Sequence, residues 1–276
     1  MAEIINILTF HHVHPQADTL TVPPELLERT LRHLSKRYRF ISQEEFSRAL
    51  LEGAALPPRP LLLTFDDGYL DNFLYAYPVL KKLEIPAIVF AITGLVRESG
   101  EIRTRMPEFR PHKALDRDPD PAYFVTTAEM REMERSGLVT FESHTVTHCS
   151  CRDKSAEEVL QELQESHRFI EAFSAPRKHY GFCWPKGRYD AVALEAIRRS
   201  PYDWAVSTID GSWSRGDDRY TIRRIDASSW DGSESRYLRR LERKLSIYSL
   251  PYLSRAYTRF REYRIRRKRA RKHSRD

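Results

Sequence analysis

Short apolar runs alternate with longer stretches of helical periodicity over most of this 276-residue chain. The runs with the length and composition of strands span residues 4–10, 61–65, 87–92, 139–142, 179–183, 204–207 and 220–225. Helical patterns span residues 24–38, 42–51, 71–83, 127–136, 155–173 and 190–199. This alternation is typical of α/β proteins in which βα units surround a largely parallel sheet. Seven strands favour a barrel or a strongly curved sheet.

Two segments depart from this alternation of strand and helix patterns. Residues 97–123 hold many charges, several prolines and little periodicity. A stretch of that length without regular structure is usually a lid or a mobile insert. After about residue 230 the pattern changes to one or two basic helices. We therefore divide the chain into a domain of residues 1–230, with an insert at 97–123, and a basic helical or disordered tail of residues 231–276.

The basic charge is concentrated at the end of the chain. Residues 255–276 carry eleven Lys or Arg and two acids and sum to +9, whereas the whole chain sums to +7. The other 254 residues are therefore nearly neutral, at −2. Tyr257, Phe260 and Tyr263 recur every three residues among these charges, as in an interfacial helix. We expect residues 255–275 to contact anionic membrane rather than nucleic acid, with a solvated tail as the alternative.

The predicted cellular compartment follows from the lack of recognisable export and membrane-spanning signals in the sequence. The N-terminus lacks the basic, apolar and small-residue regions of a signal peptide, and no run approaches 18 apolar residues. Three cysteines, an odd number, argue against a disulfide framework and favour a reducing compartment. We expect a cytoplasmic protein, with peripheral contact at the inner membrane face.

Two adjacent carboxylates follow the most apolar of the predicted strands. Residues 61–65 lead directly into Asp66, Asp67 and Gly68. In parallel sheets, functional groups collect at the carboxyl ends of the strands. Neighbouring carboxylates repel one another unless a cation or a shared proton relieves them. For so short a motif, the alternative is an Asp-Gly turn that begins the next helix.

Two histidines follow another predicted strand. His144 and His148 lie four residues apart, directly after residues 139–142. They share a face if the loop turns helically, which suits metal ligands, although such pairs are also frequent on helix surfaces. Together the two segments supply two carboxylates and two imidazoles. This set is sufficient for three ligands of a catalytic metal site and a remaining carboxylate that acts as general base.

These segments resemble the motifs of the polysaccharide deacetylases of the NodB-homology type, carbohydrate esterase family 4. The family's TFDDG motif matches residues 64–68 unchanged, and its H-[ST]-x-x-H motif matches residues 144–148. Its Arg-x-Pro-aromatic-Gly turn is represented by residues 183–187, and its Tyr-His-His-hydrophobic start by residues 9–13. The resemblance extends over roughly residues 1–230 and implies a distorted (β/α)7 barrel.

The resemblance also implies the roles of the site residues. Asp67, His144 and His148 would bind a divalent metal, and Asp66 would be the catalytic base. We expect Zn²⁺, with Co²⁺, Ni²⁺ or Mn²⁺ as alternatives. The implied reaction is metal-dependent removal of an N-acyl group, expected to be N-acetyl, from an amino sugar in a bacterial surface glycan or its lipid-linked precursor. Removal of a formyl group and a catalytically silent glycan-binding scaffold are the alternatives.

The chain departs from the family where the base should be oriented. The Arg of the third motif is replaced by Cys183. Arg223 or Arg224 could take over its role, and strand alternation favours Arg224, with a surface Arg pair as the alternative. The resemblance further implies a backbone N–H donor to the oxyanion in the same turn, which we assign to the catalytic residue Lys186.

The family's Leu-x-His motif, which supplies the general acid, is missing. The histidines at the end of the first strand are the nearest substitutes, because imidazole titrates near neutral pH. We expect His12 to be the acid and His11 to contact substrate, with a structural histidine as the alternative. Tyr69, Trp184 and Trp213 follow motifs or strand ends, where a ring can stack on a sugar, although buried core aromatics are commoner.

Overall fold

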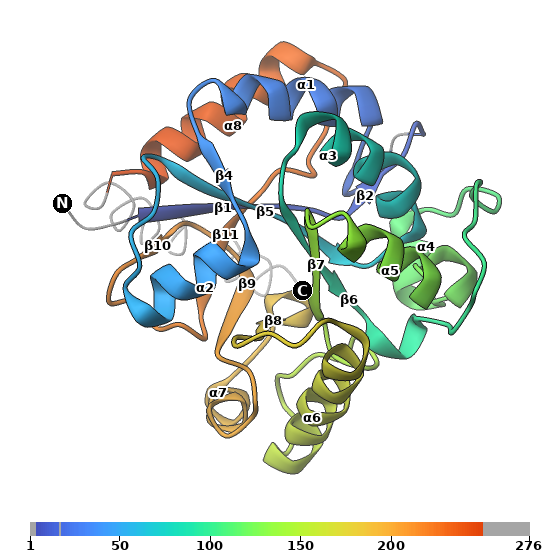
Figure 1. Cartoon of the computed structure of the whole chain (residues 1–276), viewed down its shortest axis with the longest axis vertical. Helices are drawn as coiled ribbons and strands as arrows, with labels where there is room; N and C mark the ends of the chain where they lie inside the picture. Colours follow the sequence, from blue (N-terminus) through green and yellow to red (C-terminus); the bar gives the residue numbers. More distant parts are fainter. Residues whose placement is uncertain (1–3, 17, 251–276) are drawn as a thin grey trace, which may run out of the picture.

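Seven parallel strands form a closed barrel in the computed structural model, which describes residues 4–16 and 18–250 (Figure 1). In spatial order they are β1 (Ile4–Phe10), β11 (Ile222–Asp226), β9 (Trp204–Asp210), β8 (Gly181–Cys183), β7 (Val139–Ser143), β6 (Ala87–Ala91) and β5 (Pro60–Asp67). Parallel pairing of β1 with β5 closes the ring. The predicted (β/α)7 barrel is therefore confirmed, with a strand at each of the seven predicted positions.

Short strands extend the ring at its margins. β4 (Arg39–Ile41) pairs with β5, and β10 (Trp213–Ser214) pairs antiparallel with the start of β1. A separate pair joins β2 (His12–Val13) to β3 (Thr21–Val22). The β2–β3 pair matters for the site, because it redirects the chain immediately after β1 and so decides where the two neighbouring histidines point.

Helices cover the outside of the barrel (Figure 1). They are α1 (Pro24–Ser35), α2 (Gln43–Glu52), α3 (Tyr77–Leu83), α5 (Thr127–Arg135), α6 (Ala156–Phe173), α7 (Ala191–Arg198) and α8 (Glu234–Tyr248). A π-helical turn, η1 (Asn72–Ala76), precedes α3, and single 3₁₀ turns form η2 (Thr93–Leu95) and η4 (Pro185–Gly187). Ser42 and Ser155 begin α2 and α6 through capping boxes with Glu45 and Glu158.

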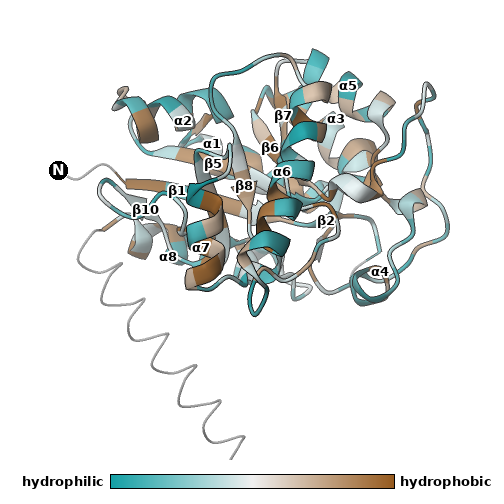
Figure 2. Cartoon of the chain, turned by 90° about the horizontal axis from the view of Figure 1, so that it is seen from below, coloured by the Kyte–Doolittle hydropathy of each residue, from teal (hydrophilic) through white to brown (hydrophobic). Residues whose placement is uncertain are grey.

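Apolar side chains fill one end of the barrel. The interior cluster includes Ile7, Leu62 and Phe90 from three strands, and Phe46 of α2 joins it by an edge-to-face contact with Trp204, with ring centroids 5.1 Å apart. In Figure 2 the strands are mostly brown and the outer surfaces of the helices largely teal. The start of the barrel is therefore closed by α2, which leaves the carboxyl ends of the strands for a polar site.

The insert at 97–123 has structure of its own. It contains α4 (His112–Arg117) and the 3₁₀ turn η3 (Pro121–Tyr123). Arg103 donates to both oxygens of the buried Glu129 in α5, at 2.8 and 2.6 Å, and to the carbonyl oxygens of Ala122 and Phe124. The insert therefore has regular structure, and a multiply bonded guanidinium attaches it to the barrel; its role as a lid or mobile segment stays a prediction.

Helix α8 lies within the segment predicted as a tail. Its apolar residues recur at helical spacing, and four of them are buried in the core: Tyr237, Leu241, Leu245 and Tyr248. Two ion pairs join α8 to α1, Arg29–Glu234 at 2.9 Å and His33–Glu242 at 2.8 Å. The boundary predicted at residue 230 thus precedes the last helix that packs on the barrel. Residues 255–275 lie outside the described residues.

Candidate metal centre and active site

The polar residues at the carboxyl ends of the strands surround one cavity of about 310 Å³. Asp66 and Asp67 are the last two residues of β5, and His144 directly follows β7. His148 lies in the loop beyond His144. The remaining lining residues come from β1, β9, β11, the loops and the insert: Thr9, His11, Leu20, His112, Asp116, Lys186, Thr208 and Asp226.

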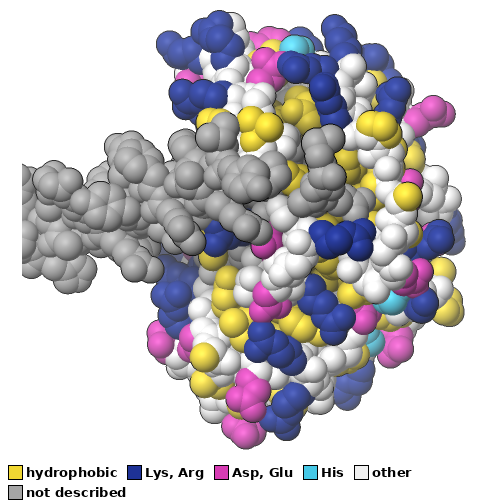
Figure 3. All heavy atoms as spheres, turned by 90° about the vertical axis from the view of Figure 1, so that its left-hand side faces the viewer, with side chains coloured by type: hydrophobic (Ala, Val, Ile, Leu, Met, Phe, Trp, Pro, Cys, Tyr) yellow, Lys and Arg dark blue, Asp and Glu magenta, His cyan; other side chains and the backbone are white. Residues whose placement is uncertain are grey.

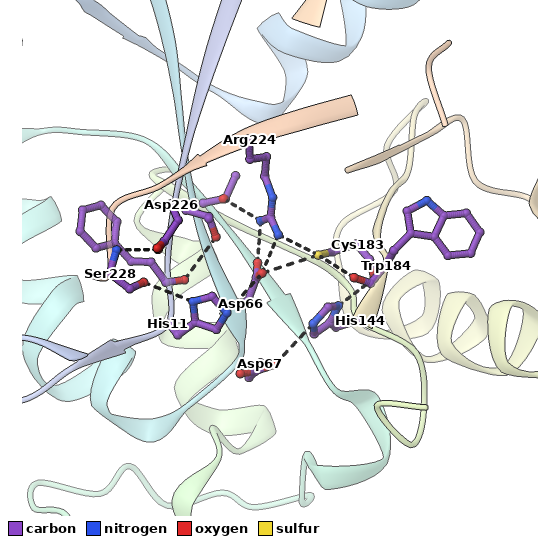
Figure 4. Close-up of polar contacts among 12 residues, drawn as sticks. His11, Asp66, Asp67, His144, Cys183, Trp184, Arg224, Asp226 and Ser228 are labelled. Carbon is purple, nitrogen blue, oxygen red and sulfur yellow. Dashed lines mark hydrogen bonds and ion pairs between the residues drawn. The ribbon is translucent and has the colours of Figure 1, made fainter. Parts of the chain in front are cut away.

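Asp67, His144 and His148 have the arrangement of metal ligands. Figure 4 shows the ring of His144 directed toward Asp67. The Nε2 atoms of both histidines lie 3.4 Å from Oδ1 of Asp67. Tetrahedral ligands at zinc distances are separated by roughly 3.3 Å, so this spacing fits a shared cation. Both carboxylate oxygens of Asp67 are buried and have no hydrogen-bond donor among the described residues. Such orphaned oxygens are costly without a cation.

The backbone around these residues is strained. Asp67, Thr145, His148 and Lys186 all have positive φ, between 57° and 72°. Left-handed conformations are uncommon for residues other than glycine, and they persist where the surrounding structure enforces them. Their concentration at this cavity shows that the fold holds the site in a fixed geometry rather than in a relaxed loop.

The ionisation of the ligand residues favours cation binding. Burial lowers the pKa of His144 to about 4, and its Nδ1 donates to the carbonyl oxygen of Cys183 at 2.7 Å. The imidazole is therefore neutral, with its Nε2 lone pair directed at Asp67. Burial alone would raise the pKa of Asp67, but His148 and His11 outweigh it and hold that pKa well below its ordinary value. The site thus combines one carboxylate with neutral imidazole, as metal ligation requires.

Asp66 is held by Arg224 and is not available as a further ligand. The guanidinium donates to Oδ1 at 2.7 Å through Nη1 and to Oδ2 at 2.6 Å through Nη2, and it is fully buried. Burial would raise the pKa of Asp66, and Arg224 more than offsets it, so the carboxyl remains ionised. The neighbouring Arg223 lies against Gly211 instead. The structure therefore places Arg224, rather than Arg223, where the family's third-motif Arg would act.

Cys183 fills the space beside this ion pair. Its Sγ lies 3.1 Å from Nη2 of Arg224 and 3.7 Å from Oδ2 of Asp66. Burial raises the pKa of the thiol well above its ordinary value, so it is a neutral group here. Asp66, His144 and Cys183 are close enough to suggest a second ligand set. However, both oxygens of Asp66 already accept from Arg224, and this set is the weaker candidate.

The two histidines after β1 point in different directions. His11 lines the cavity, with Nε2 3.8 Å from Oδ2 of Asp66 and Nδ1 3.2 Å from Oγ of Ser228. His12 points the other way and donates from Nδ1 to Asp71 at 2.6 Å, stacked on Tyr69. The prediction of His12 as the acid is contradicted, because consecutive residues in extended backbone point to opposite sides and only one can face the cavity.

The predicted aromatic sugar contacts are buried. Trp184 is fully buried and donates from Nε1 to the carbonyl oxygen of Tyr220 at 2.8 Å. Trp213 is packed in the barrel interior, and Tyr69 lies between His12 and Phe124. None of the three lines the cavity. The prediction is wrong for all three, since large rings gain more from core burial than from the rim of a polar cavity.

The insert contributes two residues that the sequence did not reveal. His112 and Asp116 of α4 both line the cavity, and Nζ of Lys186 lies 2.8 Å from Asp116. Burial lowers the pKa of His112 to about 4, so its ring is neutral. Its Nδ1 lies 3.3 Å from Oη of Tyr69. The only sequence signal was the presence of a histidine and acids in the insert that lies between the two metal motifs in sequence.

Comparison with known proteins identifies the family. A family model described as polysaccharide deacetylase matches residues 53–205, more than half of the chain. The chain therefore belongs to the polysaccharide deacetylase family, as its motifs predicted, and is a hydrolase of that family. The fold, the motif residues and this match agree.

Individual relatives are similar over most of the chain. YxkH of Bacillus subtilis, whose name places it among the polysaccharide deacetylases, is 27% identical over 223 residues, 80% of this chain and 71% of its own. The poly-beta-1,6-N-acetyl-D-glucosamine N-deacetylase of Staphylococcus aureus is 26% identical over 248 residues, 82% of this chain and 78% of its own. Each alignment covers about four fifths of this chain. Wherever such a span begins, it includes the motif residues 64–68 and 144–148.

Solved structures share the fold. The Streptococcus pyogenes deacetylase PplD, solved in complex with acetate, is 26% identical with a TM-score of 0.68, over 82% of this chain and 93% of that one. IcaB from Ammonifex degensii has a TM-score of 0.68 at 20% identity, over 86% of this chain and 96% of that one. The second likeness supports the fold alone.

Proposed function

We propose that this protein is a metal-dependent N-deacetylase of an N-acetylated amino sugar in a bacterial surface glycan or its lipid-linked precursor. The observation that carries the proposal is the pairing of Asp66 with Arg224 directly beside the Asp67, His144 and His148 group, within one cavity. The named activity of the staphylococcal relative, on poly-beta-1,6-N-acetyl-D-glucosamine, supports an N-acetyl hexosamine as substrate.

The proposed cofactor is Zn²⁺, with Co²⁺, Ni²⁺ or Mn²⁺ as alternatives. Asp67, His144 and His148 would hold it, since one carboxylate and two imidazoles form a donor set that suits these ions. When bound, the cation supplies Lewis acidity toward an amide carbonyl and makes a nearby water more acidic. The role of the protein is to position the groups that move protons around that centre.

Asp66 is the proposed base. Its carboxylate is ionised and held in a fixed orientation by two short bonds from Arg224, so it is ready to accept a proton from water. His11 is the proposed acid toward the leaving amine, in place of His12, because Nε2 of His11 faces the cavity 3.8 Å from Asp66. Ser228 orients the other nitrogen of that ring.

The turn at Lys186 is the proposed second donor to the oxyanion. Lys186 lines the cavity in a left-handed conformation, with φ of 57° and ψ of 13°. A Cβ at the following Gly187 would lie 2.1 Å from Oγ1 of Thr208, so this turn is fixed against β9. A rigid turn suits a backbone N–H donor, which must already point at the position of the developing charge.

The test is product release from a panel of N-acyl amino sugars by protein of known metal content. We expect one equivalent of metal per chain and release of acetate, with little formate from the N-formyl analogues. Asp67→Asn should lose both metal and activity. If more formate than acetate is released, the substrate carries an N-formyl rather than an N-acetyl group. A metal-free wild-type protein that releases neither acid would refute the proposal that this protein is an enzyme.

The location that we propose is the cytoplasm, with contact to anionic lipid through residues 255–275. Figure 3 shows Lys and Arg intermixed with Asp and Glu on one face of the domain, whereas the sequence of residues 255–276 sums to +9. Asn6, early in β1, donates to Ser249 at 2.8 Å, so the described chain ends at the opposite end of the barrel from the cavity. Attachment there would leave the cavity accessible.

Vesicle binding tests this location. Co-sedimentation with vesicles containing anionic lipid should be strong for the whole chain and weak for a full-length variant with Gln at the Lys and Arg positions of 264–272. Equal sedimentation of the two proteins would contradict lipid contact. Within the described residues, no helix has both the length and the apolar character that crossing a bilayer requires.

A further inference from the structure

We propose that Asp116, in the insert helix α4, is a positioning residue that orients His148 for metal binding. The inference rests on the proposed metal centre. It assigns a function to the insert, whose contribution neither the motifs nor the charge pattern reveals. Asp116 lies about thirty residues from any motif in sequence, but its carboxylate reaches the rim of the cavity between His148 and Lys186.

The imidazole of His148 lies between two carboxylates. Its Nε2 is 3.4 Å from Oδ1 of Asp67, and its Nδ1 is 3.5 Å from Oδ1 of Asp116. An Nδ1–H directed at Asp116 leaves the lone pair on Nε2, on the side that faces Asp67. The proximity of Asp116 therefore selects the tautomer and the ring orientation that metal ligation needs.

The other histidine ligand also has an oxygen atom beside its Nδ1, but there the contact is a short hydrogen bond to backbone, whereas Asp116 lies 3.5 Å from His148. His144 also has Nε2 at 3.4 Å from Asp67, and its Nδ1 donates to the carbonyl oxygen of Cys183 at 2.7 Å. His144 is 2% exposed and its acceptor is backbone, so the barrel itself orients that ring. His148 lies on a loop with its side chain 16% exposed. For His148, the group that faces Nδ1 therefore comes from a side chain outside the barrel.

Asp116 can perform this task because the insert is attached to the barrel. Arg103 binds Glu129 of α5, and the backbone N–H of His112, at the start of α4, donates to Asp18 at 3.0 Å. Asp116 also accepts from Nζ of Lys186 at 2.8 and 3.2 Å. A partly exposed ion pair of this kind adds little to folding stability. The position of Asp116 thus matters for the site more than for the fold.

The experiment compares metal affinity in matched full-length variants. Asp116→Asn removes the charge at constant size. Asp118→Asn is the control, because Asp118 lies two residues from Asp116, is exposed and pairs with Arg110 instead. Lys186→Met removes the second partner of Asp116 without altering the carboxylate. Metal-stripped proteins are titrated with Zn²⁺ against a chelator, and the visible spectrum of the Co²⁺-loaded proteins reports the ligand geometry.

We expect Asp116→Asn to weaken Zn²⁺ binding by about 10–100-fold, the usual effect of losing such a partner. Its Co²⁺ spectrum should shift, while Asp118→Asn and Lys186→Met stay within about twofold of wild type. Wild-type affinity and an unchanged spectrum in Asp116→Asn would overturn the inference, and so would an equal loss in Lys186→Met. A wild-type protein that binds no Zn²⁺ would instead refute the proposed function, and this inference with it.

Discussion

Arg224 donates to both carboxylate oxygens of Asp66 across 158 residues of sequence, at 2.7 and 2.6 Å. Relatives with the third-motif Arg would place that charge on β8, where this chain has Cys183. Here the guanidinium comes from β11, also donates to the carbonyl oxygen of Ser207 and to Oγ1 of Thr64, and packs against the thiol. The same carboxylate is therefore oriented from a different strand.

Removing this guanidinium should damage both activity and folding. Arg224→Gln leaves Asp66 buried without its partner, which should cost about 3–5 kcal/mol of unfolding free energy. Loss of the oriented base should lower kcat/KM by about 10²–10⁴-fold. Acetate release and urea unfolding measure the two effects. Arg223→Gln is the matched control at the adjacent position and should change neither; equal effects of the two variants would contradict the assignment.

The two histidines after β1 should separate into a chemical and a structural role. His11→Ala should lower kcat on an N-acetyl amino sugar by about 10²-fold or more, because the amine then leaves without a proton donor. The same variant should be much less impaired on an aryl acetate, whose leaving group needs no proton. Comparing the two substrates is the measurement. Equal losses on both would remove His11 from the role of acid.

His12→Ala should act mainly on stability. The substitution removes the donor to buried Asp71, at 2.6 Å, and the ring stacked on Tyr69. A buried group that loses its partner costs about 1–3 kcal/mol. Urea unfolding should show this loss, while the ratio of rates on the amide and the aryl ester stays at the wild-type value. A selective loss of amide hydrolysis would show that His12 is the acid after all.

Substitution of Gly94 should weaken Zn²⁺ binding, although Gly94 is not a proposed metal ligand. Its N–H donates to the carbonyl oxygen of Val146 at 3.0 Å, in the loop between His144 and His148, and a Cβ at Gly94 would lie 2.5 Å from that oxygen. Gly94→Ala should displace the loop and weaken Zn²⁺ binding by tenfold or so. Gly100→Ala, where a Cβ meets nothing within 4 Å, is the control. Unchanged affinity in Gly94→Ala would contradict the coupling.

Local patterns explain why so much of the fold was predictable. Strand alternation, helical periodicity and the capping boxes at Ser42 and Ser155 are each set by neighbouring residues. Closure of the barrel through β1 and β5 was predictable only as part of a family resemblance, because it joins segments more than fifty residues apart. A basic helix after residue 230 was predicted and α8 is one, but its packing on the barrel was not predicted, since its many charges obscure the buried apolar positions at helical spacing.

Residues of the candidate site were predictable where they belong to a motif or where strand alternation fixes the direction of the side chain. Strand alternation indicated Arg224 over Arg223, and the structure places Arg224 inside the barrel. His11 and His12 follow the end of β1, where the chain turns into β2, so no alternation could choose between them. Asp116 could not be found, because no periodicity places α4 over the cavity.

Glu142 should give the stability of the protein a distinct pH dependence. This β7 residue is fully buried, accepts from Nε2 of Gln43 at 2.8 Å and lies 3.0 Å from Nη2 of Arg177. Burial raises its pKa from 4.5 to about 7, although Arg177 opposes the rise. Since the folded state binds this proton more tightly, the contribution of Glu142 is fully present below about pH 4.5 and is lost as the pH rises through 7.

Urea unfolding of the chelator-treated protein between pH 5 and pH 8 tests this dependence. Wild type should lose about 2–3 kcal/mol more unfolding free energy over that range than Glu142→Gln, whose side chain does not titrate. Glu157→Gln, an exposed substitution on α6, is the control and should follow the wild-type slope. Parallel slopes for wild type and Glu142→Gln would mean that Arg177 keeps Glu142 ionised at both ends of the range, and that the buried carboxylate is stabilised by its ion pair rather than by a proton.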